Sequence, residues 1–132
     1  MSRVPQIKKL PEIVFINPNV SWEMKTDMNE IMKVIDNPKW ADTWIDYCLA
    51  NKIHFELIDC EALDMTPDIV CFHLKNMKPR LICIIVSSRA SMIEGKELAD
   101  IIVEELPKTD TWFVADVVLK SAEAEIEKIL KK

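Results

Sequence analysis

Short groups of polar residues follow the four most apolar stretches of this chain, and their side chains are the best placed to do chemistry. The groups are Asn17-Pro18-Asn19, Asp59-Cys60, Ser87-Ser88-Arg89 and Ala115-Asp116. Their amide, hydroxyl, guanidinium and carboxylate groups can bind a polar ligand or a phosphate. Ligands of open parallel sheets bind beyond the carboxyl ends of the strands, so these groups are candidate site residues if the apolar stretches are such strands.

The apolar stretches have the length and composition of strands, and helix-patterned segments separate them. We expect strands at Ile13–Ile16, Phe55–Ile58, Leu81–Val86 and Thr111–Val114. Helical spacing of apolar residues begins near Asp27, Trp40, Pro67, Ser91 and Ser121, with Thr66 and Ser121 as expected N-caps. This alternation predicts an α/β fold with a doubly wound parallel sheet, and the six apolar residues from Leu81 predict a central strand.

Length and pattern indicate one domain, residues 12–132, after a polar lead-in of residues 1–11. The chain ends after a helix, where a doubly wound domain would add a fifth strand. We therefore expect an open sheet edge, so that either the chain is a fragment, or this edge is covered by the N-terminal segment or by a partner chain, for example in a homodimer.

The charge and hydropathy of the chain limit the classes of partner and the location that we expect. The chain has 22 acidic and 17 basic residues, a net charge of -5, and no long basic run, which argues against nucleic acid or an anionic membrane as a partner. Neither a secretory apolar region nor an apolar stretch of about 18 residues is present in the sequence. A cytoplasmic protein is the expectation.

Several chemistries are excluded by residue type. Gly95 is the only glycine, so the glycine-dependent phosphate loops GxGxxG and GxxxxGK[ST] cannot form. The only histidines, His54 and His73, precede the second strand and lie within a helix, which argues against a hydrolase triad. The four cysteines lack zinc-site or CxxC spacing, and the apolar neighbours of Cys71 and Cys83 predict buried thiols.

An ordered set of segments resembles a known family. It runs from Ile16-Asn17-Pro18 through Tyr47-Cys48-Leu49-Ala50-Asn51-Lys52, Leu57-Ile58-Asp59-Cys60-Glu61-Ala62, Thr66-Pro67-Asp68 and Lys78-Pro79-Arg80-Leu81-Ile82 to Ser87-Ser88-Arg89-Ala90-Ser91, Glu97-Leu98-Ala99 and Phe113-Val114-Ala115. Over residues 12–130 this order resembles the N-terminal cobalamin-binding domain of B12-dependent radical SAM enzymes.

The resemblance implies a flavodoxin-like sheet of order 2-1-3-4 that holds base-off cobalamin on the loops after its first, third and fourth strands. The residues that map to these loops, with the role of enclosing the corrin and its nucleotide tail, are Asn17, Pro18, Asn19, Ser87, Ser88, Arg89, Ser91, Ala115 and Asp116. No histidine of this chain is expected to bind the cobalt. The implied partner is a radical SAM catalytic domain or chain, because no CxxxCxxC motif for an iron–sulfur cluster occurs here.

Departures from the family keep other interpretations open. Family members carry glycines after the third and fourth strands, where this chain has Ser88-Arg89 and Ala115-Asp116. An excised domain, a degenerate standalone relative and an engineered copy all fit. The function expected first is a cobalamin-binding module that is not catalytic alone; the alternatives are a cofactor-free structural or interaction domain and a small independent enzyme, for which no acid–base pair can be named.

Overall fold

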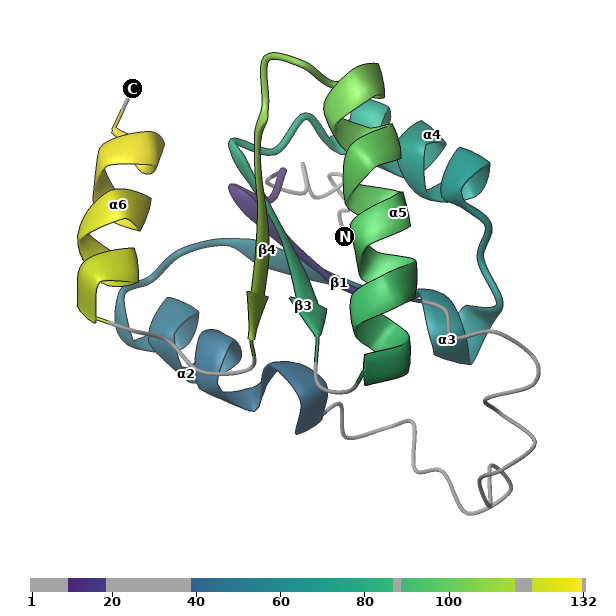
Figure 1. The fold of residues 1–132 in the computed structure, drawn as a ribbon. Coiled ribbons are helices and arrows are strands. Elements are labelled where there is room, and N and C mark those ends of the chain that lie inside the picture. The colour runs from purple at the N-terminus through teal and green to yellow at the C-terminus, as the bar shows by residue number, and fades with distance from the viewer. Residues whose placement is uncertain (1–9, 19–38, 87–88, 116–119, 132) are drawn as a thin grey trace, which may run out of the picture.

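The computed structural model describes residues 10–18, 39–86, 89–115 and 120–131 as an α/β fold (Figure 1). Four parallel strands form one sheet in the order β2-β1-β3-β4. Their bounds are β1 Ile13–Asn17, β2 Phe55–Asp59, β3 Leu81–Val86 and β4 Asp110–Ala115. This confirms the predicted class and the flavodoxin-like strand order. The helix expected from Asp27 lies outside the described residues.

Helices cover both faces of the sheet. The short α3 (Cys60–Leu63), α4 (Pro67–Met77) and α5 (Arg89–Glu105) contribute to the apolar cluster on one face. The 3-10 turn η2 (Lys39–Ala41), α2 (Asp42–Ala50) and α6 (Lys120–Leu130) contribute to the cluster on the other face. Figure 1 looks onto the edge of the sheet formed by β4, with α5 and α4 on its right and α2 and α6 on its left.

Strand alternation builds these two clusters. Along β1, Val14 and Ile16 point toward α4 and α5, whereas Ile13 and Phe15 point toward α2 and α6. Both β1 and β3 are buried almost throughout, because they have a strand on each side and helices on each face. The central position predicted for Leu81–Val86 is confirmed.

Two of the predicted helix starts need correction, and the third is confirmed in position. Ser121 is not the N-cap of α6, because that helix already includes Lys120. Helix α5 begins at Arg89 rather than Ser91, since arginine is a good helix former and extends the helix toward β3. Thr66 is the N-cap of α4, but its side chain makes no cap hydrogen bond, and Pro67 begins the helix with no N–H of its own.

The two outer strands of the described sheet differ in exposure. In β2 only Ile58 is fully buried, and in β4 half of the residues are exposed. Within the described ranges, no strand pairs with the outer side of β4 or of β2. None of the helices described has the length and apolar character that crossing a membrane requires.

Candidate functional site at the carboxyl edge of the sheet

The carboxyl ends of the four strands form one continuous edge. Asn17 is in register with Asp59, and Val86 is in register with Ala115. Strand order changes direction between β1 and β3, so the switch point of the sheet, where open α/β folds bind ligands, lies at this edge. Of the predicted site residues, Asn17, Pro18, Arg89, Ser91 and Ala115 are described here. Asn19, Ser87, Ser88 and Asp116 lie outside the described residues.

Asn17 is held by the neighbouring strand. Its Nδ2 donates a hydrogen bond of 2.9 Å to Oδ1 of Asp59, and the backbone N–H of Ala62 donates one of 3.0 Å to the same oxygen. Asp59 is thereby both the N-cap of α3 and the link between β2 and β1. The amide of Asn17 is committed to this frame, so its first role is to fix where the loop after β1 begins.

Pro18 packs over the ends of β1 and β3 beside α5. It is buried, and a Cβ atom placed on Gly95 of α5 would lie 3.2 Å from Pro18 Cγ, 3.1 Å from Val86 Cγ1 and 2.9 Å from Phe113 Cε1. These distances are shorter than ordinary carbon–carbon contacts. The single glycine therefore lets α5 approach the sheet at the switch point.

Arg89 and Ser91 occupy the first turn of α5 at the same edge. Arg89 is exposed, so its guanidinium is accessible to an anion. Ser91 is only 3% exposed, which makes it the one polar residue among the fully buried side chains described. The first turn of α5 therefore places a cationic side chain at the surface and a hydroxyl group in the interior.

Two tryptophans belong to the apolar cluster on the face of the sheet that α2 and α6 cover. Trp44 is buried, its ring centroid is 5.7 Å from that of Phe15, and its Nε1 donates a 3.1 Å hydrogen bond to the carbonyl oxygen of Ala115. Nε1 of Trp40, one turn earlier, is buried and has no hydrogen-bond partner. It is the only such side-chain nitrogen or oxygen in the described part of the chain, and an unsatisfied buried donor is costly. Both residues belong to the helical apolar pattern expected from Trp40, but that pattern gave no information about the partners of their indole nitrogens.

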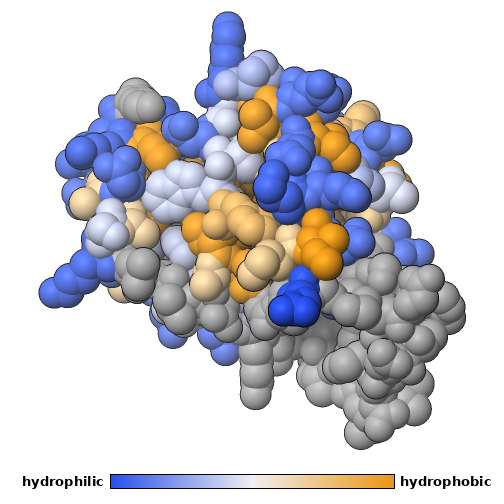
Figure 2. Space-filling model, viewed as in Figure 1, coloured by the Kyte–Doolittle hydropathy of each residue, from blue (hydrophilic) through white to orange (hydrophobic). Residues whose placement is uncertain are grey.

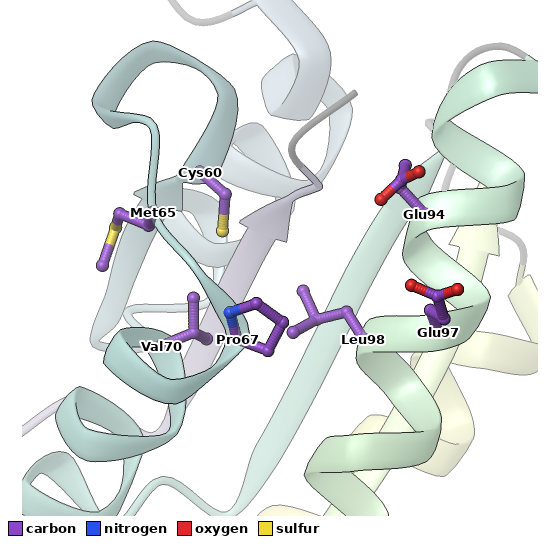
Figure 3. A pocket seen from close by; sticks show the side chains of 7 residues that line it. All are labelled: Cys60, Met65, Pro67, Val70, Glu94, Glu97 and Leu98. Carbon is purple, nitrogen blue, oxygen red and sulfur yellow. The ribbon is translucent and has the colours of Figure 1, made fainter. Parts of the chain in front are cut away.

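A small pocket of about 40 Å³ lies between α5 and the start of α4 (Figure 3). Pro67 and Leu98 face each other across it, with Cys60 on one side and Glu94 and Glu97 along α5. This volume holds about three water molecules. The pocket is therefore too small for a nucleotide base or a corrin ring.

The thiols are buried and protonated. Burial, assisted by Asp59, raises the pKa of Cys60 to about 12, and burial with a contribution from Glu12 raises the pKa of Cys48 to about 12. Burial also raises the pKa of Cys71 and that of Cys83, which confirms the predicted environment of these two thiols. A protonated thiol is a poor nucleophile and a poor metal ligand. Across the described residues, no group of three or more His, Cys, Asp or Glu side chains is arranged to hold a metal ion.

The histidines lie away from the carboxyl edge. His54 precedes β2 at the amino edge, where its carbonyl oxygen accepts a 2.9 Å hydrogen bond from the N–H of Glu12. His73 lies on α4, is exposed, and has its ring centroid 5.7 Å from that of Phe72. Both positions agree with those predicted from the sequence.

No protein-family model, no curated protein and no solved structure matches this chain. The class that the fold defines is an α/β domain with a four-stranded, all-parallel, flavodoxin-like sheet.

Proposed function

We propose that this chain is a cobalamin-binding module whose ligand lies over the carboxyl edge of the sheet. The observation that carries the proposal is the strand order. The resemblance implies that the loops after the first, third and fourth strands enclose the corrin, and β1, β3 and β4 are adjacent. Adjacent parallel strands are about 4.8 Å apart, so the three loops begin within about 10 Å of one another.

The described residues at this edge fit the chemistry of such a ligand. Cobalamin carries amide side chains around the corrin and a phosphate in its nucleotide tail. The exposed guanidinium of Arg89 can bind a phosphate. The pocket beside Cys60 holds only about 40 Å³ and would not hold the corrin, so the residues along the carboxyl edge would hold it instead.

In this proposal the chain holds the cofactor and another domain or chain performs the reaction. The sequence has no CxxxCxxC triplet for an iron–sulfur cluster. Cobalamin would supply a cobalt centre for methyl transfer, and this chain's residues would orient the corrin and exclude water from one of its faces. A radical SAM catalytic domain is the corresponding partner.

The test is a titration of the full chain with hydroxocobalamin, followed by the visible corrin spectrum. We expect saturation at one corrin per chain and a base-off spectrum. Arg89→Glu is expected to weaken binding about tenfold, because it replaces a charge-assisted hydrogen bond with repulsion of the tail phosphate. Lys108→Glu is the matched control: it makes the same charge change in an exposed residue at the amino edge and is expected to leave binding unchanged.

A spectrum that does not change on titration would overturn the proposal. Equal weakening by Arg89→Glu and Lys108→Glu would also contradict it, because only net charge would then matter.

One observation favours a second function, a cofactor-free interaction domain. Pro18, Val86 and Phe113 close around Gly95, so described side chains already fill the α5 side of the switch point. This function predicts that the spectrum stays unchanged while the folded chain is retained by a protein partner.

A further inference from the structure

The outer side of β4 and the flank of α5 beside it form an apolar surface, here called the β4 ledge and defined by Met92, Ala99, Val103 and Phe113. Met92 is 51% exposed, Val103 52% and Phe113 38%. Figure 2, which faces this edge, shows apolar residues gathered in the middle of the view, where β4 and the start of α5 lie in Figure 1. No strand pairs with this side of β4 in the described part of the chain.

Helical geometry places this flank of α5 over the open edge. Ser91, Leu98 and Ile102 are buried against the sheet. Glu94 and Glu97 line the pocket that α5 shares with the start of α4. At 100° per residue, positions 92, 96, 99 and 103 then lie on the opposite flank, away from α4 and above the outer side of β4.

We propose that the β4 ledge binds a second copy of this chain, with the two β4 strands antiparallel about a two-fold axis near Trp112. Helix α5 packs on both β3 and β4, so its axis lies about half a strand spacing inside β4. The two-fold axis lies half a spacing outside β4. Two α5 helices related by this axis are therefore about 10 Å apart, which is the distance at which helices pack.

The two-fold axis also fixes which residues of the two helices meet. Gly95 lies against Phe113, and one strand residue spans about as much length as two helical residues. Trp112 is therefore level with Glu97 and Leu98, in the middle of α5. Symmetry about this level brings Lys96 of one copy next to Asp100 of the other.

Charge complementarity selects a second copy as the occupant. Lys96 is the only cation of α5 beyond Arg89, on a helix that carries five acidic residues. Within one chain, Lys96 Nζ lies 3.3 Å from Asp100 Oδ2, and the two side chains are 69% and 68% exposed. The two-fold axis joins the two pairs into a network of two lysines and two aspartates beside apolar residues of the ledge. An isologous contact of this kind closes at the dimer.

This inference does not rest on cobalamin binding. Antiparallel β4 strands point the two carboxyl edges in opposite directions, so both candidate sites stay accessible. Failure of the dimer and failure of corrin binding are therefore read from separate measurements.

The test is the mass of the full chain by sedimentation equilibrium over a range of concentrations. We expect a monomer–dimer equilibrium for the natural chain. Lys96→Asp and Asp100→Lys are each expected to raise the dimer dissociation constant at least tenfold, because each places like charges across the axis. Mixing the two variants is expected to restore dimerisation as a heterodimer. Positions 96 and 100 are then both acidic in one chain and both basic in the other.

Substitutions of exposed apolar residues by lysine provide the control. Met92→Lys is expected to weaken the dimer, whereas Phe72→Lys removes a 64% exposed aromatic residue from α4 and is expected to leave the dimer intact. A monomer at every concentration would overturn the proposal. A dimer that forms equally well from Lys96→Asp alone would overturn it too, because the contact would then lie elsewhere.

Discussion

Gly95 is a residue whose missing side chain matters more than the flexibility of its backbone. It lies inside α5 with no positive φ, where alanine would normally stabilise the helix by about 1 kcal/mol. Three neighbours from β3, β4 and the loop after β1 lie close to the position that a Cβ atom of residue 95 would take. The close approach of α5 to the sheet, rather than a turn, explains why the glycine is here.

We predict that Gly95→Ala lowers the free energy of unfolding by about 1 kcal/mol, because an overpacking cost of about 1–3 kcal/mol exceeds the gain in helix propensity. Urea unfolding followed by circular dichroism measures this change. In a Phe113→Leu background the loss should shrink, since the nearest atom, Phe113 Cε1 at 2.9 Å, is then removed. A more stable Gly95→Ala variant would show that α5 does not pack this closely.

Because the thiols are buried, we expect the folded chain to lose stability at alkaline pH. A thiol titrates near pH 9 in the unfolded chain, whereas burial raises the pKa of Cys48 and that of Cys60 to about 12 in the folded chain. The folded state therefore binds more protons between pH 9 and 12. Each thiol makes its full contribution to the free energy of unfolding below pH 9. Above pH 9 that contribution falls by about 1.4 kcal/mol per pH unit.

Replacing one thiol tests this linkage. Cys48→Ala is expected to reduce the slope of unfolding free energy against pH above pH 9 by about 1.4 kcal/mol per unit, whatever its effect at neutral pH. Thr43→Ala, on the exposed side of α2, should leave the slope unchanged. Equal slopes for the natural chain and Cys48→Ala would contradict a protonated Cys48 thiol in the folded state.

At the scale of elements, three helix ends use non-glycine residues where glycine is usual. Lys52, Asp64 and Lys78 have φ values of 57°, 52° and 52°. Lys78 is the C-cap of α4, and its N–H donates a 2.9 Å hydrogen bond to the carbonyl oxygen of Leu74. A left-handed conformation costs a residue with a Cβ atom about 1–2 kcal/mol.

We therefore expect Lys78→Gly to raise the free energy of unfolding by about 1 kcal/mol, because the strain at this C-cap disappears. Asn76→Gly is the control, since Asn76 has helical backbone in the same turn and should lose stability on this change. Thermal unfolding of both variants gives the comparison. Destabilisation of both would mean that Lys78 contributes contacts worth more than the strain.

Asp59 connects two elements through one oxygen atom. Its Oδ1 accepts hydrogen bonds from Ala62 N–H and from Asn17 Nδ2. Asp59→Ala is expected to cost about 2 kcal/mol, because the N-cap of α3 is lost and the Asn17 amide loses its acceptor. Asp59→Asn keeps an oxygen acceptor and should cost less; equal costs in chemical denaturation would show that the charge, not the acceptor, stabilises this edge.

At the scale of the whole molecule, the sheet was predictable because its strands are local apolar runs. Leu81–Val86 is six apolar residues long, and burial on both faces demands such a run. Helix ends were less predictable: Ser121 has the residue type of an N-cap but lies inside α6. The sequence also gave no sign of α3, because four residues are too few for a helical period to appear.

The candidate edge was predicted in position but not in detail. Strand ends locate Arg89 and Ala115 from sequence alone. The link between Asn17 and Asp59 and the hydrogen bond from Trp44 to Ala115 join residues 42 and 71 positions apart. Such contacts depend on strand order and register, which local patterns do not contain. The predicted place of Asn17 beside a ligand stays a prediction, and the hydrogen bond from its amide to Asp59 is a feature that the sequence did not indicate.

Cobalamin binding at this sheet edge is tested most directly by equilibrium dialysis of the full chain against hydroxocobalamin. We predict that the corrin accumulates on the protein side to one molecule per chain and that the bound corrin has a base-off spectrum. Equal corrin concentrations on both sides of the membrane, with the chain folded by circular dichroism, would contradict it.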